Sequence, residues 1–71
     1  MTECEGALNQ WAKEHDAHVN YYLEYEYYVH FDVCFAPDEF FIGRALNGST
    51  TDMLAICDDQ YRKFIMREVL K

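Results

Sequence analysis

Polar and apolar residues alternate without interruption between positions 18 and 35 of the chain. The odd-numbered positions are apolar or aromatic from Val19 to Phe35, and the even-numbered positions carry carboxylates, histidines, an amide, tyrosines and a thiol. A period of two places successive side chains on opposite faces of a β-strand. No Gly or Pro interrupts the run, and β-branched and aromatic residues are favoured in strands. The pattern predicts one long amphipathic strand over residues 19–35, with a buried odd face and a hydrated even face.

The length of this predicted strand raises the question of what covers it. At a rise of about 3.3 Å per residue, the run would span roughly 56 Å, whereas a compact domain of this length has a diameter of about 30 Å. The strand must therefore bend or bulge near its middle, around residues 26–28, or a second copy of the protein must cover its far half. A hairpin inside the run is disfavoured, because it contains no turn residue and a two-residue loop would invert the parity. We therefore expect a homodimer formed through or beside the strand.

A helix is predicted before the strand. Thr2 and Glu5 have the spacing of a capping box, in which the hydroxyl accepts from a free backbone N–H and the carboxylate reaches back to the cap. Asp16 and Ala17 then form a short link to the strand. Apolar side chains recur at helical spacing and form one stripe, which we expect to lie across the dry face of the strand. The stripe consists of Cys4, Ala7, Leu8, Trp11, Ala12 and His15.

The segment after the strand is ambiguous between helix and strand. In residues 36–48, Pro37 resembles a helix start and Gly48 a helix stop, yet the aromatic and β-branched residues between them are equally good strand residues. A lone strand cannot satisfy its backbone hydrogen bonds, so the long strand needs neighbours. This requirement favours strands at 39–46 and 53–57, joined through a turn.

The chain is predicted to end in a helix. Asp58 and Asp59 could cap this helix, or it could begin at Thr51 with Ser49 and Asp52 as the capping box. Its buried side would carry Tyr61, Phe64, Ile65 and Val69. The expected fold is therefore α+β, in a single small domain of residues 1–71: an N-terminal helix, a long amphipathic antiparallel strand with one or two shorter strands, and a C-terminal helix. The side chains expected to be mostly buried are Trp11, Leu23, Tyr25, Tyr27, Val29, Phe31 and Phe64.

Charge is unevenly distributed along the chain. The 71 residues carry a net charge of -7. Residues 1–59 hold twelve acidic and two basic side chains, a sum of -10, whereas residues 60–71 hold one acidic and four basic side chains, a sum of +3. An acidic body is repelled by the phosphates of nucleic acids and anionic lipids. We therefore expect no direct nucleic-acid or membrane binding, and we expect a basic protein as the partner.

The cysteine pattern indicates a reducing compartment. Cys4, Cys34 and Cys57 are odd in number and widely spaced, which is not the pattern of a secreted disulfide framework or of a structural zinc site. The N-terminal segment lacks the basic and apolar regions of a signal peptide, and no apolar stretch has the length of a membrane span. These features predict a cytoplasmic protein.

Candidate chemistry is weak elsewhere in the chain. Glu24 and Glu26 would lie about 6.6 Å apart along the strand by rise alone, a separation compatible with acid/base catalysis, but on an open face they would be hydrated. His15 and His18 straddle the predicted junction between helix and strand, which is a poor geometry for a metal. The cysteines lie among acids or apolar residues, which does not activate a thiolate. The clustered tyrosines could stack on bases, but such platforms are framed by Lys and Arg. We therefore expect no enzymatic activity, no metal and no cofactor.

The even face of the predicted strand is the candidate binding surface. It combines carboxylates, which steer a basic partner, with tyrosines, which supply rigid contact area. The partner-binding residues predicted in this way are Tyr22, Glu24, Glu26, Tyr28 and Asp32.

These features together predict a small acidic, non-enzymatic protein-binding module. Its partner would be a basic protein whose nucleic-acid-binding surface the acidic face occupies. In size and charge alone, the chain is similar to phage-encoded anti-host and anti-CRISPR inhibitors, which act by such competition. The alternative is a structural, homo-oligomeric protein that assembles through its long strand.

Overall fold

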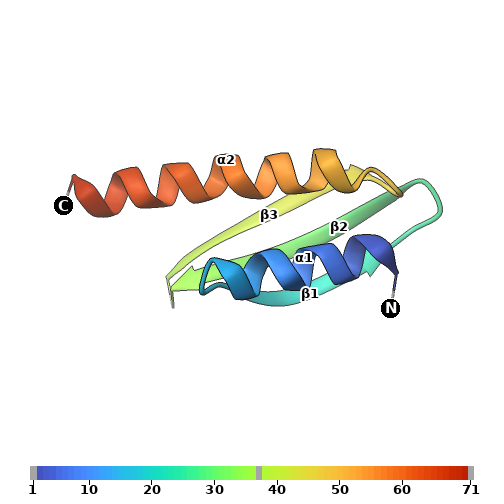
Figure 1. Cartoon of the computed structure of the whole chain (residues 1–71), viewed down its shortest axis with the longest axis horizontal. Helices are drawn as coiled ribbons and strands as arrows, with labels where there is room; N and C mark the ends of the chain where they lie inside the picture. Colours follow the sequence, from blue (N-terminus) through green and yellow to red (C-terminus); the bar gives the residue numbers. More distant parts are fainter. Residues whose placement is uncertain (1, 37, 71) are drawn as a thin grey trace.

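Two helices cover one face of a three-stranded antiparallel sheet (Figure 1). The computed structural model describes residues 2–36 and 38–70. The sheet has the order β1-β2-β3, and the molecule measures 40 × 18 × 17 Å. In chain order the elements are α1 (Glu3–Glu14), β1 (His18–Glu24), β2 (Tyr28–Ala36), β3 (Glu39–Leu46) and α2 (Thr50–Val69). The predicted α+β fold, with a helix at each end, is confirmed.

Helix α1 begins and ends as the sequence predicts. The backbone N–H of Glu5 donates to Oγ1 of Thr2 at 3.2 Å, which is the expected cap. The predicted stripe faces the core, where Cys4, Leu8, Trp11 and Ala12 are buried. After the helix, Asp16 adopts a positive φ of 55°, a left-handed conformation that Asp tolerates better than most residues. This residue reverses the chain into β1.

The prediction of one long strand is wrong, because the chain turns back at residues 25–27 and forms a hairpin. Glu24 lies opposite Val29 in the antiparallel ladder of β1 and β2. The turn contains no Gly or Pro, and a distant residue supplies the hydrogen bonds that it needs. The backbone N–H of Asn47 donates to the carbonyl oxygen of Tyr27 at 3.0 Å, and Nδ2 of Asn47 donates to the carbonyl oxygen of Tyr25 at 2.8 Å. The turn therefore depends on the connection between β3 and α2.

A β-bulge between Val19 and Tyr21 changes which side chains of β1 face the helices. On the N-terminal side of the bulge, Val19 pairs with Val33, so odd-numbered residues of β1 lie opposite odd-numbered residues of β2. On the turn side Tyr22 pairs with Phe31. Residues opposite one another on adjacent strands share a face, so after the bulge the even positions of β1 lie on the helix-covered face. The predicted parity holds for β2 and fails for most of β1.

Of the two strands proposed after residue 36, one is present. Strand β3 confirms the predicted strand at 39–46, whereas residues 53–57, also predicted as a strand, belong to α2. This helix begins at Thr50, one residue before the alternative start considered from the sequence, and its N-cap Ser49 makes no side-chain cap bond. Met53 and Cys57 lie one helical turn apart and are both fully buried. Their packing against the sheet explains why this segment is helical.

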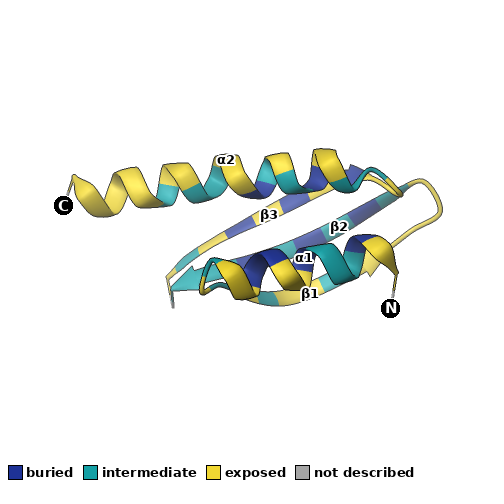
Figure 2. Cartoon of the chain, in the orientation of Figure 1, coloured by how far each residue is buried: buried dark blue, intermediate teal, exposed yellow. Residues whose placement is uncertain are grey.

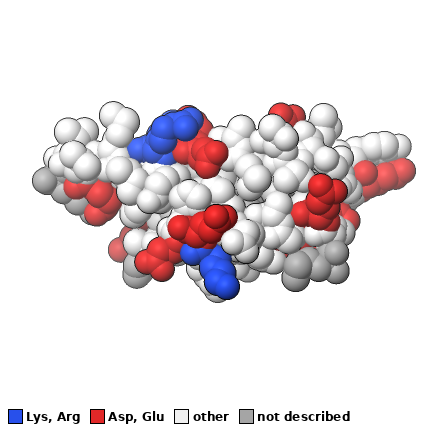
Figure 3. Space-filling view, viewed as in Figure 1, with Lys and Arg blue, Asp and Glu red and all other residues white. Residues whose placement is uncertain are grey.

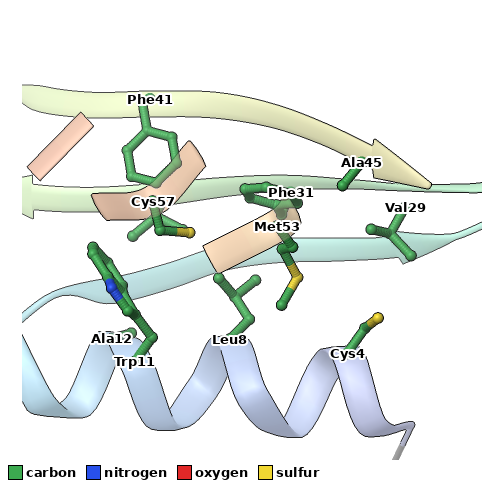
Figure 4. Packing of buried hydrophobic residues seen from close by; sticks show 11 residues of the cluster. Cys4, Leu8, Trp11, Ala12, Val29, Phe31, Phe41, Ala45, Met53 and Cys57 are labelled. Carbon is green, nitrogen blue, oxygen red and sulfur yellow. The ribbon is translucent and has the colours of Figure 1, made fainter. Parts of the chain in front are cut away.

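The core lies between the helices and the sheet (Figures 2 and 4). Trp11, Val29 and Phe31 are buried as predicted. Phe64 is half-buried, with its ring stacked on Phe35 at a centroid distance of 4.7 Å. Three predicted core residues are instead exposed: Leu23, Tyr25 and Tyr27. The bulge turns Leu23 away from the helices, and the turn carries the two tyrosines out of the sheet.

The C-terminal half of α2 is mostly exposed (Figure 2). Its apolar side chains at Ile65, Met66 and Val69 are exposed, and Val69 and Ile65 therefore do not form the buried side that was predicted. An ion pair of 2.8 Å between Nη2 of Arg67 and Oε2 of Glu39 connects this part of the helix to the start of β3. Neither helix of the described residues is both long and apolar enough to cross a membrane.

Candidate functional site

Two of the five predicted binding residues lie on the helix-covered side of the sheet. Tyr22 is opposite Phe31, and Glu24 is opposite Val29. The hydroxyl of Tyr22 donates to Oε1 of Glu24 at 2.9 Å and lies 3.5 Å from Oγ1 of Thr2. Burial raises the pKa of Tyr22 to about 12, and its hydrogen bond to Thr2 opposes this change. Tyr22 thus attaches the edge strand to the start of α1.

The other three predicted residues lie elsewhere. Tyr28 and Asp32 are on the face of the sheet opposite the helices, because they alternate with the buried residues of β2. Glu26 lies in the turn between β1 and β2. The structure therefore does not bring the five residues together on one face, although Glu24, Glu26 and Tyr28 remain neighbours around the turn.

The end of the β1–β2 hairpin presents a cluster of tyrosines and carboxylates, which we name the hairpin tip (residues 24–28). Tyr27 is 74% exposed, and the ring of Tyr25 stacks on that of Tyr28 at a centroid distance of 4.7 Å. The two bonds from Asn47 and the bond from the N–H of Tyr25 to the carbonyl oxygen of Tyr28 hold the turn in place. Both carboxylates of the tip, Glu24 and Glu26, are exposed.

A shallow hollow of about 300 Å³ adjoins the hairpin tip. Tyr27, Tyr28, Arg44, Ala45 and Leu46 line it. The guanidinium carbon of Arg44 lies 3.9 Å from the centroid of the Tyr28 ring, a cation–π contact that holds both side chains in place. The hollow is thus an apolar surface whose one charged group is already paired with an aromatic face.

The sheet also has an uncovered face, which we name the open face: the side opposite both helices. Strands β2 and β3 contribute side chains that alternate with their buried ones, and β1 contributes Tyr21 and Leu23, which pair with Asp32 and His30. Its exposed large apolar side chains are Tyr21, Leu23, Phe40, Ile42 and Leu46. Asp32 and Arg44 supply its two charges. Asp32 accepts a hydrogen bond from Nδ2 of Asn20 at 3.3 Å, and Tyr21 stacks on His30 at 5.9 Å.

Acidic side chains dominate the helix-covered side of the molecule. Figure 3 shows Asp and Glu spread across the viewed side, with Lys and Arg gathered at a few points. Two of the bases, Arg62 and Lys63, are paired with Asp59 at 3.7 and 3.2 Å. All three side chains are more than half exposed, so these pairs contribute little to stability. They do reduce the positive charge that α2 presents to a partner.

The histidines and cysteines are involved in packing. The ring of His15 stacks on Trp11 at 4.1 Å, and its Nδ1 lies 2.7 Å from the carbonyl oxygen of Trp11. Burial raises the pKa of the Cys57 thiol to about 12, and Cys34 donates to the carbonyl oxygen of Ala36 at 2.7 Å. Among residues 2–36 and 38–70, no group of three His, Cys, Asp or Glu side chains is placed to hold a metal ion.

A second hollow, of about 450 Å³, lies between the end of α1 and the start of β1. Its lining is Asn9, Ala12, Lys13, Asp16, Ala17, His18 and Val19. The two charged groups, Lys13 and Asp16, are both exposed. An open hollow with exposed charges of opposite sign lacks the apolar lining that is typical of a small-molecule site.

Sequence reasoning placed Tyr25 and Tyr27 in the core and so missed their exposure at the hairpin tip. No signal in residues 18–36 marks the turn, because Gly, Pro and Asn-Gly dipeptides are absent from its position. The signal is Asn47, in the turn-forming pair with Gly48, which has a positive φ of 90°. Its side chain and backbone donate to the hairpin at Tyr25 and Tyr27, 22 and 20 residues earlier in the chain.

Comparison with protein-family models, with curated proteins and with solved structures gives no significant match for this chain.

Proposed function

We propose that this chain is a small non-enzymatic protein-binding module that docks through its hairpin tip. The observation that carries the proposal is the exposure of Tyr25 and Tyr27 in a turn that three hydrogen bonds hold in place, two from Asn47 and one between Tyr25 and Tyr28. Tyrosine supplies a large contact area and loses little conformational entropy on binding. A turn that is held by hydrogen bonds loses still less, since it is ordered before the partner arrives.

The charge of the tip favours a basic partner. Glu24 and Glu26 flank Tyr25 and are exposed beside Tyr27, and the chain as a whole carries a net charge of -7. Carboxylates at the rim of an interface attract a basic surface and accelerate association, while buried aromatic anchors slow dissociation. Within the tip, Glu24 and Glu26 therefore attract the partner, and Tyr27 anchors it once bound.

The partner class that fits best is a nucleic-acid-binding protein, because its phosphate-binding surface is rich in Lys and Arg. A chain that occupied this surface would act as an inhibitor by mimicking nucleic acid, which is the strategy of phage-encoded anti-host and anti-CRISPR proteins. Three thiols without disulfides, two of them buried, support a reducing cytoplasm as the place of action.

The experiment that tests this function uses matched variants of the immobilised chain. Proteins retained from a host lysate are identified by mass spectrometry, and binding of the purified partner is then followed kinetically. Tyr27→Ala should accelerate dissociation at least about tenfold, whereas Val69→Ala, which truncates an equally exposed side chain on α2, should leave it unchanged. Glu24→Lys combined with Glu26→Lys should slow association and flatten its salt dependence, whereas Glu14→Lys on α1 should have the smaller effect of a remote charge.

Competition provides the second measurement. Increasing amounts of the chain should displace a fluorescently labelled nucleic acid from the purified partner. If the partner holds nucleic acid and this chain at the same time, mimicry is excluded. If the tip variants bind with unchanged rates at every ionic strength, or if no protein is retained, the hairpin tip is not a docking site.

A further inference from the structure

The open face exposes several large apolar side chains. Phe40 and Ile42 at the centre of β3 are 59% and 56% exposed, and Leu46 is 65% exposed. Tyr21 and Leu23 add to the same face from β1. An aromatic side chain has about 150–250 Å² of surface and Leu or Ile somewhat less, so the five half-exposed side chains together leave roughly 500 Å² of apolar surface, divided between β1 and β3.

This area suits a two-copy interface. A standard interface buries about 800 Å² from each partner. The apolar side chains of the open face supply more than half of that, and the polar residues of β2 that lie between them supply the remainder. Sheets that pack face to face approach to about 10 Å, and the open face has no helix or loop of the described residues lying over it (Figure 1).

Charge distinguishes this face from the rest of the molecule. The chain carries -7, so two copies repel one another across most of their surfaces. The outward side chains of the three strands include one carboxylate, Asp32, and one guanidinium, Arg44. The open face is therefore electrically balanced, and a second copy meets no net repulsion there. A basic partner is attracted more strongly by the acidic hairpin tip than by this face.

The arrangement of the two charges is self-complementary. Asp32 lies opposite Ile42 and His30 lies opposite Arg44, so Asp32 and Arg44 are diagonal neighbours on β2 and β3. A two-fold axis that lies in the plane between two facing sheets, midway between these residues and perpendicular to the line that joins them, places Asp32 of each copy against Arg44 of the other. An isologous interface requires this property, because each contact occurs twice.

We propose that the open face binds a second copy of this chain, sheet against sheet, with the pair of Asp32 and Arg44 formed twice across the interface. The helices then lie on the two outer sides of a four-layered dimer, and residues 24–27 of each hairpin tip stay exposed at its periphery. The inference does not rest on the proposed function. Arg44 and Leu46 of the open face also line the hollow beside the hairpin tip, so the two surfaces are separated by substituting Glu24, Glu26 and Tyr27 for the tip and Asp32, Phe40 and Ile42 for the dimer face.

Sedimentation equilibrium of the full chain tests the dimer. The wild-type chain should sediment at twice its mass of 8.5 kDa. Phe40→Thr combined with Ile42→Thr keeps residues that favour strands and removes the apolar surface, so it should give a monomer. Met66→Gln combined with Val69→Gln removes two comparably exposed side chains from α2 and should leave the dimer intact. Circular dichroism verifies that each variant is folded.

A charge exchange tests the register of the two sheets. Asp32→Arg alone places like charges together twice, as does Arg44→Asp alone, so each variant should be monomeric. An equimolar mixture of the two should form a heterodimer, because each guanidinium again meets a carboxylate. A monomeric wild type, a dimer lost in the α2 variant and kept in the β3 variant, or a mixture that stays monomeric would each overturn the proposal.

Discussion

The two faces of the sheet are built from the same three strands and differ in what covers them. On the covered face, Val29, Phe31 and Val33 of β2 are fully buried beneath both helices. On the open face, the intervening positions of β2 carry His30 and Asp32, and the apolar side chains lie on the flanking strands. Hydrophobic burial therefore determines the fold through one face only. The apolar side chains on the other face contribute little to the stability of a single copy and are available for binding.

The largest effect should follow substitution at the centre of the covered face. Phe31→Ala removes a fully buried ring from the middle of β2 and should cost about 3–5 kcal/mol. A domain of this length has a total stability of roughly 4–10 kcal/mol. Urea unfolding monitored by circular dichroism should show a chain that is unfolded or nearly so. A folded variant with a midpoint close to that of the wild type would mean that the covered face does not hold the structure together.

A single added methyl group on the same face should also destabilise the protein. A Cβ at Gly43 would overlap the ring of Phe31 on the neighbouring strand. Gly43→Ala should therefore cost about 1–3 kcal/mol, as overpacked cores do. The effect should shrink when Phe31→Leu is combined with it, because the smaller side chain leaves room. Equal costs of Gly43→Ala in the two backgrounds, measured by urea unfolding, would exclude this contact as the cause.

Stability should decline at alkaline pH because of a buried thiol on the helix that covers this face. Burial raises the pKa of Cys57 from 9.0 to about 12, so the folded chain keeps the proton that the unfolded chain loses above pH 9. The stabilisation is complete below pH 9 and decreases by about 1.4 kcal/mol for each pH unit between 9 and 12. Denaturant midpoints at pH 8 and pH 10 measure this slope. In Cys57→Ala the decrease of stability with pH that the thiol causes should disappear. An unchanged slope would mean that other groups cause the decrease.

The smallest effect is expected on the open face. Ile42→Thr replaces a side chain of similar shape that is 56% exposed, so the stability of the single chain should change by less than about 0.5 kcal/mol. The measurement is urea unfolding extrapolated to low protein concentration, where a dimer dissociates. A cost comparable with that of Gly43→Ala would show that the two faces contribute alike to the monomer.

Those parts of the fold that depend on local patterns could be predicted. Thr2 and Glu5 signal the start of α1, and the stripe of Cys4, Leu8 and Trp11 specifies its buried side. The odd positions of β2 are buried as the alternation predicts. At 53–57, where a strand was predicted, Met53 and Cys57 are four residues apart, which is the spacing of one helix face, so the local pattern here also indicates a helix.

The candidate site could be predicted only in part. Glu24, Glu26 and Tyr28 were expected on one strand face, whereas Glu24 lies on the helix-covered side, Glu26 in the turn and Tyr28 on the open face. The division of the remaining residues between two faces follows from the bulge beside Asn20 and from the turn. Neither feature has a local signal, because the residues there are equally suitable for a continuous strand.

The sequence by itself determined the class of the fold, the position of α1, the buried face of β2 and the separation of acidic from basic charge, because each of these depends on neighbouring residues along the chain. Only the tertiary structure decided where the alternating run turns back and which tyrosines are exposed. The physical reason is that the hydrogen bonds from Asn47 satisfy the carbonyls of Tyr25 and Tyr27, which lie 22 and 20 residues earlier in the chain. A pattern along the chain contains no signal for a hydrogen bond between residues that only the pairing of β3 with β2 brings together.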